Sequence, residues 1–129
     1  MAAWDFGPDP YTYERVAADL PWTGKRPVYV VRRGDRLLGV IVPVRINTDT
    51  RIAGTRLRRA GLGRDGFAAV VPNVHSFTGA KLGGFGTFIE RDRRRDAAED
   101  LEDRRRSDPD FDDAFVAASV AHYRKDPTP

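Results

Sequence analysis

The sequence predicts an α+β fold in which a small antiparallel sheet is built on a β-hairpin, with a short N-terminal helix and a charged helical C-terminal region. Three observations indicate this fold. Two strand-forming runs flank a tight polar turn within residues 27–45, apolar residues recur at helical spacing within residues 11–20, and helix-capping signals follow residue 87. With 129 residues and no internal repeat, the chain has the length of one domain.

The hairpin is the clearest local signal in the sequence. Residues 28–31 and 37–42 are rich in valine, leucine and isoleucine, and the Gly-Asp dipeptide at 34–35 suits a two-residue turn between them. This turn would place Val31 opposite Leu38 and would leave both faces of the ribbon apolar. We therefore expect each face to be covered by helices, by further strands or by a second subunit.

The segment before the hairpin predicts the short N-terminal helix, over residues 11–20. Val16 and Leu20 are four residues apart and Tyr13 lies about one turn earlier, so the three side chains would share one face of a helix. Pro21 would end this helix, because the residue before a proline disfavours helical backbone angles.

The middle of the chain carries weaker signals. Residues 51–59 fit either a basic helix or a strand, residues 61–66 fit a loop and residues 67–71 fit a strand. Residues 72–86 hold five glycines or prolines, which predicts a surface loop. The glycines of this segment do not follow the order of a dinucleotide fingerprint or a phosphate-binding loop, so we expect no cofactor.

Two helices are expected in the C-terminal region. Residues 87–106 are strongly charged and have a thin apolar stripe that would pack weakly on any surface. Residues 109–125 begin with proline and aspartates and end with basic residues, the order that the helix dipole favours. We therefore divide the chain into an α+β core domain, residues 1–90, and a charged helical extension, residues 91–129. The last helix has an apolar stripe, which we expect to bind a protein partner. The stripe consists of Phe111, Phe115, Ala118 and His122.

The composition excludes several classes of protein. The chain has no cysteine, which excludes disulfides, thiolate zinc sites and cysteine nucleophiles. The first residues lack the basic and apolar regions of a signal peptide, and the longest apolar run, residues 37–44, is too short to cross a bilayer. We expect a cytoplasmic protein without membrane contact.

Candidate catalytic residues are few. An enzyme usually needs a nucleophile, a base or a metal, and the chain has two histidines, His75 and His122, neither at metal-ligand spacing from other ligands. His75 precedes Ser76 in the predicted loop and is the one candidate base, while the carboxylates suggest no catalytic pair. We therefore expect no catalytic residue, no metal site and no enzymatic activity. A small enzyme that uses His75 is the alternative.

Positive charge is concentrated in the hairpin and in the residues that follow it. Residues 1–24 carry one basic and four acidic side chains, a net −3, whereas residues 25–64 carry eleven basic and two acidic side chains, a net +9. Arginines that face each other at the hairpin turn would repel unless an anion such as phosphate lay near them. The sequence therefore predicts a DNA-contacting set of five residues: Lys25, Arg26, Arg32, Arg33 and Arg36.

The segments RPVYVVRRG at 26–34 and LGVIVP at 38–43 resemble the hairpin of the prevent-host-death type antitoxins. In that family a short helix precedes a strand that ends in an Arg-Arg-Gly-like turn, and the return strand ends at Val-Pro. The resemblance implies a dimer that binds operator DNA through its N-terminal half and wraps a toxin with a C-terminal segment. It covers about a third of the chain.

These observations lead to two hypotheses about function. The first is a non-enzymatic DNA-binding regulator of antitoxin type, a homo-oligomer that contacts phosphate through the basic hairpin region and a protein partner through the last helix. The alternative is a structural or assembly subunit that oligomerises through its β-hairpin. The salt dependence of DNA binding would separate them, because phosphate-driven binding weakens as salt is added.

Overall fold

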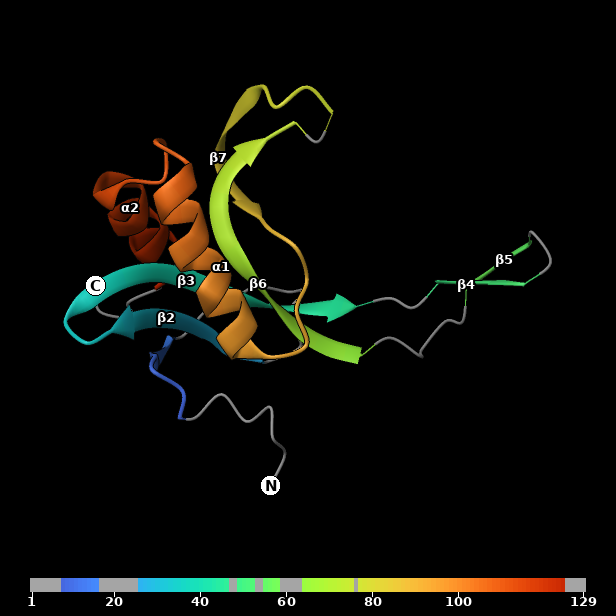
Figure 1. Cartoon of the computed structure of the whole chain (residues 1–129), viewed down its shortest axis with the longest axis horizontal. Helices are drawn as coiled ribbons and strands as arrows, with labels where there is room; N and C mark the ends of the chain where they lie inside the picture. Colours follow the sequence, from blue (N-terminus) through green and yellow to red (C-terminus); the bar gives the residue numbers. More distant parts are fainter. Residues whose placement is uncertain are drawn as a thin grey trace.

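The computed structural model describes residues 8–16, 26–46, 49–52, 55–58, 64–75 and 77–124. The strands in these segments are β1 (Thr12–Val16), β2 (Val28–Arg33), β3 (Arg36–Ile46), β4 (Asp49–Ile52), β5 (Thr55–Arg58), β6 (Arg64–Val74) and β7 (Lys81–Thr87), and the helices are α1 (Arg94–Ser107) and α2 (Asp113–Tyr123). Five strands form one antiparallel sheet in the order β1-β2-β3-β6-β7, while β4 and β5 pair only with each other (Figure 1). The fold is a sheet-rich α+β fold.

The predicted N-terminal helix is wrong, because residues 12–16 form strand β1. β1 pairs antiparallel with β2 and places Tyr13 opposite Val31 and Val16 opposite Val28. Aromatic and β-branched residues suit a strand, and pairing satisfies the backbone of β2 on the side away from β3. Residues 17–25, which include the rest of the predicted helix, lie outside the described residues.

The β2–β3 hairpin has the predicted turn but a different register beyond it. Gly34 has a φ of 61°, and Arg33 pairs with Arg36 beside the turn. A bulge then inserts Leu38, so that Val31 pairs with Gly39 and not with Leu38 as the turn alone predicted. Gly39 has a φ of 151°, and a Cβ atom there would lie 3.0 Å from a methyl group of Leu101. The bulge therefore brings the hairpin backbone close to α1.

The predicted surface loop at residues 72–86 is also wrong, since most of it is strand. β6 continues to Val74 and β7 returns beside it, with Phe85 opposite Pro72. The strand was not predicted because glycine is a poor strand former, and β7 carries an irregularity where Gly83 and Gly84 adopt positive φ angles of 77° and 73°.

α1 packs on the sheet, contrary to the weak packing expected from its thin apolar stripe. Ala97, Ala98 and Leu101 have no exposed surface and join a core cluster with Ile41 of β3. The helix begins at Arg94, later than expected, because the chain after β7 first hydrogen-bonds along β6. Two alanines let the helix backbone approach the sheet closely, so a narrow stripe suffices.

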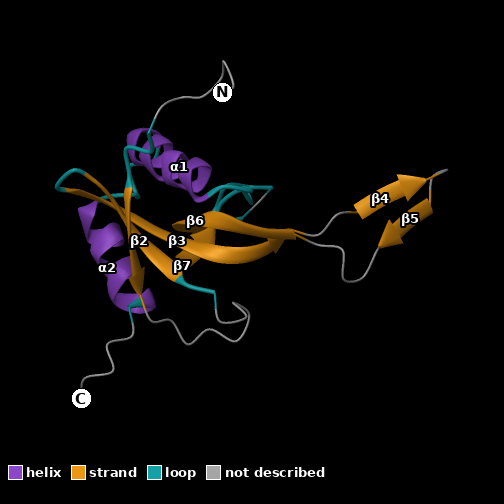
Figure 2. Cartoon of the chain, turned by 90° about the horizontal axis from the view of Figure 1, so that it is seen from below, coloured by secondary structure: helices purple, strands orange, loops and turns teal. Residues whose placement is uncertain are grey.

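α2 connects the two faces of the sheet. It starts later than predicted, with Asp112 as the N-cap that accepts a hydrogen bond from the Phe115 amide at 2.8 Å. Val116 is buried in the cluster under α1, whereas Tyr123 is buried in a second cluster with Val30 and other residues of the opposite face. Figure 2 shows α1 and α2 on different sides of the curved strands. Both apolar faces of the hairpin are therefore covered by this chain itself.

Candidate nucleic-acid interface

Arg26, one of the predicted DNA-contacting residues, is part of the architecture of the sheet. Its guanidinium donates to the carbonyl oxygens of Val44 at 2.9 Å and Gly66 at 2.6 Å. It also lies 3.3 Å from a carboxylate oxygen of Asp65 and 5.7 Å from the ring centre of Phe67. These contacts tie the start of β2 to β3 and β6 and occupy the donors that a phosphate would need.

Arg32 is paired within the chain. Its guanidinium lies 3.0 Å from Glu14 on β1, and Arg124 at the end of α2 binds the same carboxylate. The hydrogen bond from Arg32 and the charge of Arg124 lower the pKa of Glu14. This exposed network joins β1, β2 and α2.

Arg33 is paired as well, at the tip of the β2–β3 hairpin. It donates to Glu102 of α1 at 2.9 Å and lies 5.9 Å from the ring centre of Tyr11, whose hydroxyl donates to the same carboxylate. Burial opposes the charge of Glu102, but these two donors outweigh it and lower its pKa, while burial and Glu102 raise the pKa of Tyr11. The contacts fix the hairpin tip against α1.

Arg36 differs from the other members of the predicted set. It is exposed beside the turn, and no ion pair links it to another described residue. Lys25 lies outside the described residues. The structure therefore gives intramolecular partners to three of the five predicted residues and brings Arg33 and Arg36 together across the turn.

The β4–β5 ribbon, which we call the arm, carries a second concentration of basic residues. It pairs Asp49 with Arg58 and Arg51 with Arg56 and has no ladder to the main sheet. Figure 2 shows it beyond the ends of β3 and β6, away from both helices. Residues 47–64 contain five arginines and one aspartate, a net charge of +4.

The sequence left residues 51–59 open between a helix and a strand. The one available signal was Gly54, because glycine suits a turn between two short strand-forming runs.

The predicted partner-binding residues of the last helix do not form one exposed stripe. Phe111 precedes α2 and is buried, with 2% of its surface exposed, and its ring packs edge-on against Phe115. Phe115 is half-buried, whereas Ala118 and His122 are exposed. His122 stacks on the ring of Phe85 with ring centres 4.8 Å apart. Phe111, the first residue of the predicted stripe, is therefore part of the core.

His75 has a conformational role. Its Nδ1 atom accepts from the backbone amides of Phe77 at 3.2 Å and Thr78 at 3.3 Å, so it shapes the turn between β6 and β7. Among the residues that the structure describes, no group of three or more histidine or acidic side chains could hold a metal ion. Neither α1 nor α2, the helices of the described chain, is long and apolar enough to cross a membrane.

Comparison of the chain with protein-family models, with curated proteins and with solved structures gives no match.

Proposed function

We propose that this protein binds duplex DNA through the arm, with arginines of β4 and β5 contacting phosphate and the ribbon lying in the major groove. One observation carries the proposal: residues 47–64, with a net charge of +4, include a two-stranded ribbon that lies outside the main sheet. The major groove of B-form DNA is about 12 Å wide and admits a two-stranded ribbon. Phosphate contacts by arginine supply affinity without requiring base recognition.

Ion pairs within the chain make the β2–β3 hairpin a poor candidate for phosphate binding. Arg26, Arg32 and Arg33 would each have to give up a carboxylate before binding phosphate. Arg36 begins β3, whereas the arm follows the other end of β3, so the two lie at opposite ends of the sheet (Figure 1). The proposed interface thus lies further along the chain than the predicted one, and arginine contacts phosphate in both. Regulation of transcription and a toxin as protein partner stay predictions.

The test is a titration of the protein into a fluorescently labelled duplex, followed by anisotropy at several salt concentrations. If the arm makes three to five phosphate contacts, log K should fall with log salt concentration with a slope of about −3 to −5. An RNA duplex of the same sequence should bind more weakly, because the major groove of A-form helices is too narrow for a ribbon. Binding that does not respond to salt would contradict the proposal.

A charge-matched pair of variants locates the contact. Replacing the three arginines of the arm strands with glutamine should weaken binding by on the order of 100-fold and reduce the slope by about 3. The control replaces three exposed arginines of the main domain, which removes the same total charge. Equal losses in the two variants would show that overall charge, and not the arm, determines binding. The arm variant changes Arg51, Arg56 and Arg58, and the control changes Arg93, Arg106 and Arg124.

A second candidate function, an assembly subunit, is favoured by a different hairpin from the one that the sequence suggested. The β2–β3 hairpin is covered on both faces, but the β6–β7 hairpin exposes Val74, Phe77 and Leu82. Apolar side chains gathered on one exposed hairpin are typical of a protein contact.

A further inference from the structure

Phe77 lies on the outside of the fold, between β6 and β7. Its side chain is 92% exposed, the highest fraction among the large apolar residues that the structure describes as exposed. His75 accepts from the amide of Phe77, and the backbone closes the turn through His75 N to Ala80 O at 2.8 Å and Gly79 N to His75 O at 2.9 Å. A phenyl ring in water is unfavourable, because burying it would gain a large apolar area. The turn therefore leaves the ring exposed to solvent, where it can contact another molecule.

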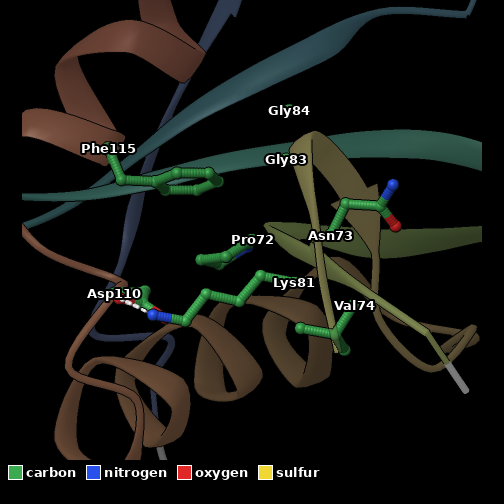
Figure 3. Close-up of a pocket in the computed structure, with 8 residues that line it drawn as sticks. All are labelled: Pro72, Asn73, Val74, Lys81, Gly83, Gly84, Asp110 and Phe115. Atoms are coloured by element: carbon green, nitrogen blue, oxygen red, sulfur yellow. Dashed lines mark hydrogen bonds and ion pairs between the residues drawn. The ribbon is translucent and has the colours of Figure 1, made fainter. Parts of the chain in front are cut away.

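The same hairpin carries a pocket of about 190 Å³ near its turn (Figure 3). Pro72 and Val74 of β6 line it, and the ring of Phe115 lines it from α2. Gly83 and Gly84 also line it, and their positive φ angles are strained for any other residue. The backbone at this irregularity therefore places no side chain in the pocket.

An ion pair lies at the rim of the pocket. Lys81 of β7 lies 2.9 Å from Asp110, in the turn that leads into α2 (Figure 3). This pair links β7 to the segment that positions Phe115. Apolar side chains of two elements thus line the pocket together with Asn73 and the charged pair, a combination typical of binding sites.

The ring and the pocket match in size and chemistry. A protein cavity of about 150 Å³ lined by apolar groups accommodates benzene, so 190 Å³ has room for a phenyl ring. Because both lie on one hairpin, a two-fold axis beside the hairpin can bring the ring of each copy to the pocket of the other. We propose that two copies of this chain associate by reciprocal insertion of Phe77 into the pocket of the partner copy. This inference develops the second candidate function and does not depend on DNA binding.

The contact is small, which sets the expected affinity. Two rings with the flanking Val74 and Leu82 bury less than the roughly 800 Å² per partner of a stable complex. We therefore expect a dissociation constant in the micromolar range. The dimer should be detectable by sedimentation velocity between about 10 µM and 1 mM protein.

Three variants test the contact. Phe77→Ser removes the ring, and Val74→Asp places a charge in the pocket at a position that is exposed in the monomer. Each should raise the dissociation constant by on the order of 1,000-fold. Either variant removes both ring–pocket contacts of the dimer, and the loss of each contact weakens binding by about 30-fold. Ile89→Ser, an exposed apolar residue that does not line the pocket, is the control and should leave it unchanged. Far-UV circular dichroism confirms that all three variants are folded.

A mixing experiment tests the reciprocity. The Phe77→Ser copy keeps an intact pocket and the Val74→Asp copy keeps an intact ring, so their heterodimer can form one of the two ring–pocket contacts. An equimolar mixture, with one variant labelled at its amino terminus, should associate about 30-fold more tightly than either variant alone. A mixture no better than its components would overturn the reciprocal contact.

The wild-type result separates the possible failures. A wild-type protein that is monomeric at 1 mM contradicts both this inference and the assembly function. A wild-type dimer that is unaffected by Phe77→Ser and Val74→Asp contradicts the inference alone and leaves assembly to another surface.

Discussion

Replacing Leu101 with alanine tests whether α1 is an integral layer of the fold. Leu101 has no exposed surface, and its methyl groups fill the space left by the missing side chain of Gly39 and lie beside Phe111. Truncation of a fully buried leucine costs about 3 to 5 kcal/mol, including the cavity that is left. A domain of this size has a free energy of unfolding of roughly 5 to 15 kcal/mol, so the loss is a large part of the total.

Urea unfolding followed by far-UV circular dichroism measures this loss. Leu82→Ala is the matched control, since it removes the same atoms from a side chain that is 57% exposed, and it should cost less than about 0.5 kcal/mol. The slope of the free energy against urea should stay the same in both variants. A loss for Leu101→Ala below about 1 kcal/mol, close to that of the control, would refute the packing of α1 on the sheet.

Three further predictions follow from the contacts of single residues. Arg26→Met should lower the free energy of unfolding by about 2 kcal/mol, because two carbonyl oxygens lose a charged donor, and Arg26→Lys should restore less than half of it in urea unfolding. Gly39→Ala should cost about 1 to 3 kcal/mol, since its φ of 151° is strained for alanine and its Cβ atom crowds Leu101, whereas Gly34→Ala, with open space around the Cβ atom, should cost only the strain. Glu102→Gln should remove an acid-sensitive part of the stability: the pKa of Glu102 is lowered in the fold, so its contribution is present above the ordinary value near 4.5 and is lost as pH falls through the lowered value. Unfolding at pH 7 and at pH 3 should thus show a wild-type advantage over Glu102→Gln that shrinks on acidification, and an equal advantage at both pH values would contradict the assignment.

Local chemistry predicted the features that depend on a few neighbouring residues. Gly34 takes the positive φ that the Gly-Asp turn requires, and the helical nature of the C-terminal region follows from its charge order. The register of the hairpin was predictable only as far as Leu37, because the bulge at Leu38 is set by the approach of Leu101, some sixty residues later in the chain.

Contacts between distant segments account for the features that the sequence did not reveal. Tyr13 and Val16 are three residues apart and fit one face of a helix, but the unpaired side of β2 makes them a strand. β7 is rich in glycine and becomes a strand because β6 supplies its partner. The sequence suggests that Arg26 is a surface cation, yet it donates to the carbonyl oxygen of Gly66, forty residues later in the sequence. Its availability to DNA was therefore not visible in the sequence.

A titration of isotope-labelled protein with duplex DNA, followed by amide chemical shifts, tests the central claim most directly. If the arm is the interface, the amide resonances of β4 and β5 and the neighbouring Arg45 should shift or broaden first, while those of α1 and α2 stay in place. Addition of salt should reverse the changes, because phosphate contacts weaken as salt rises. Changes confined to the β2–β3 turn or to α2, with the arm unaffected at saturating DNA, would contradict the account.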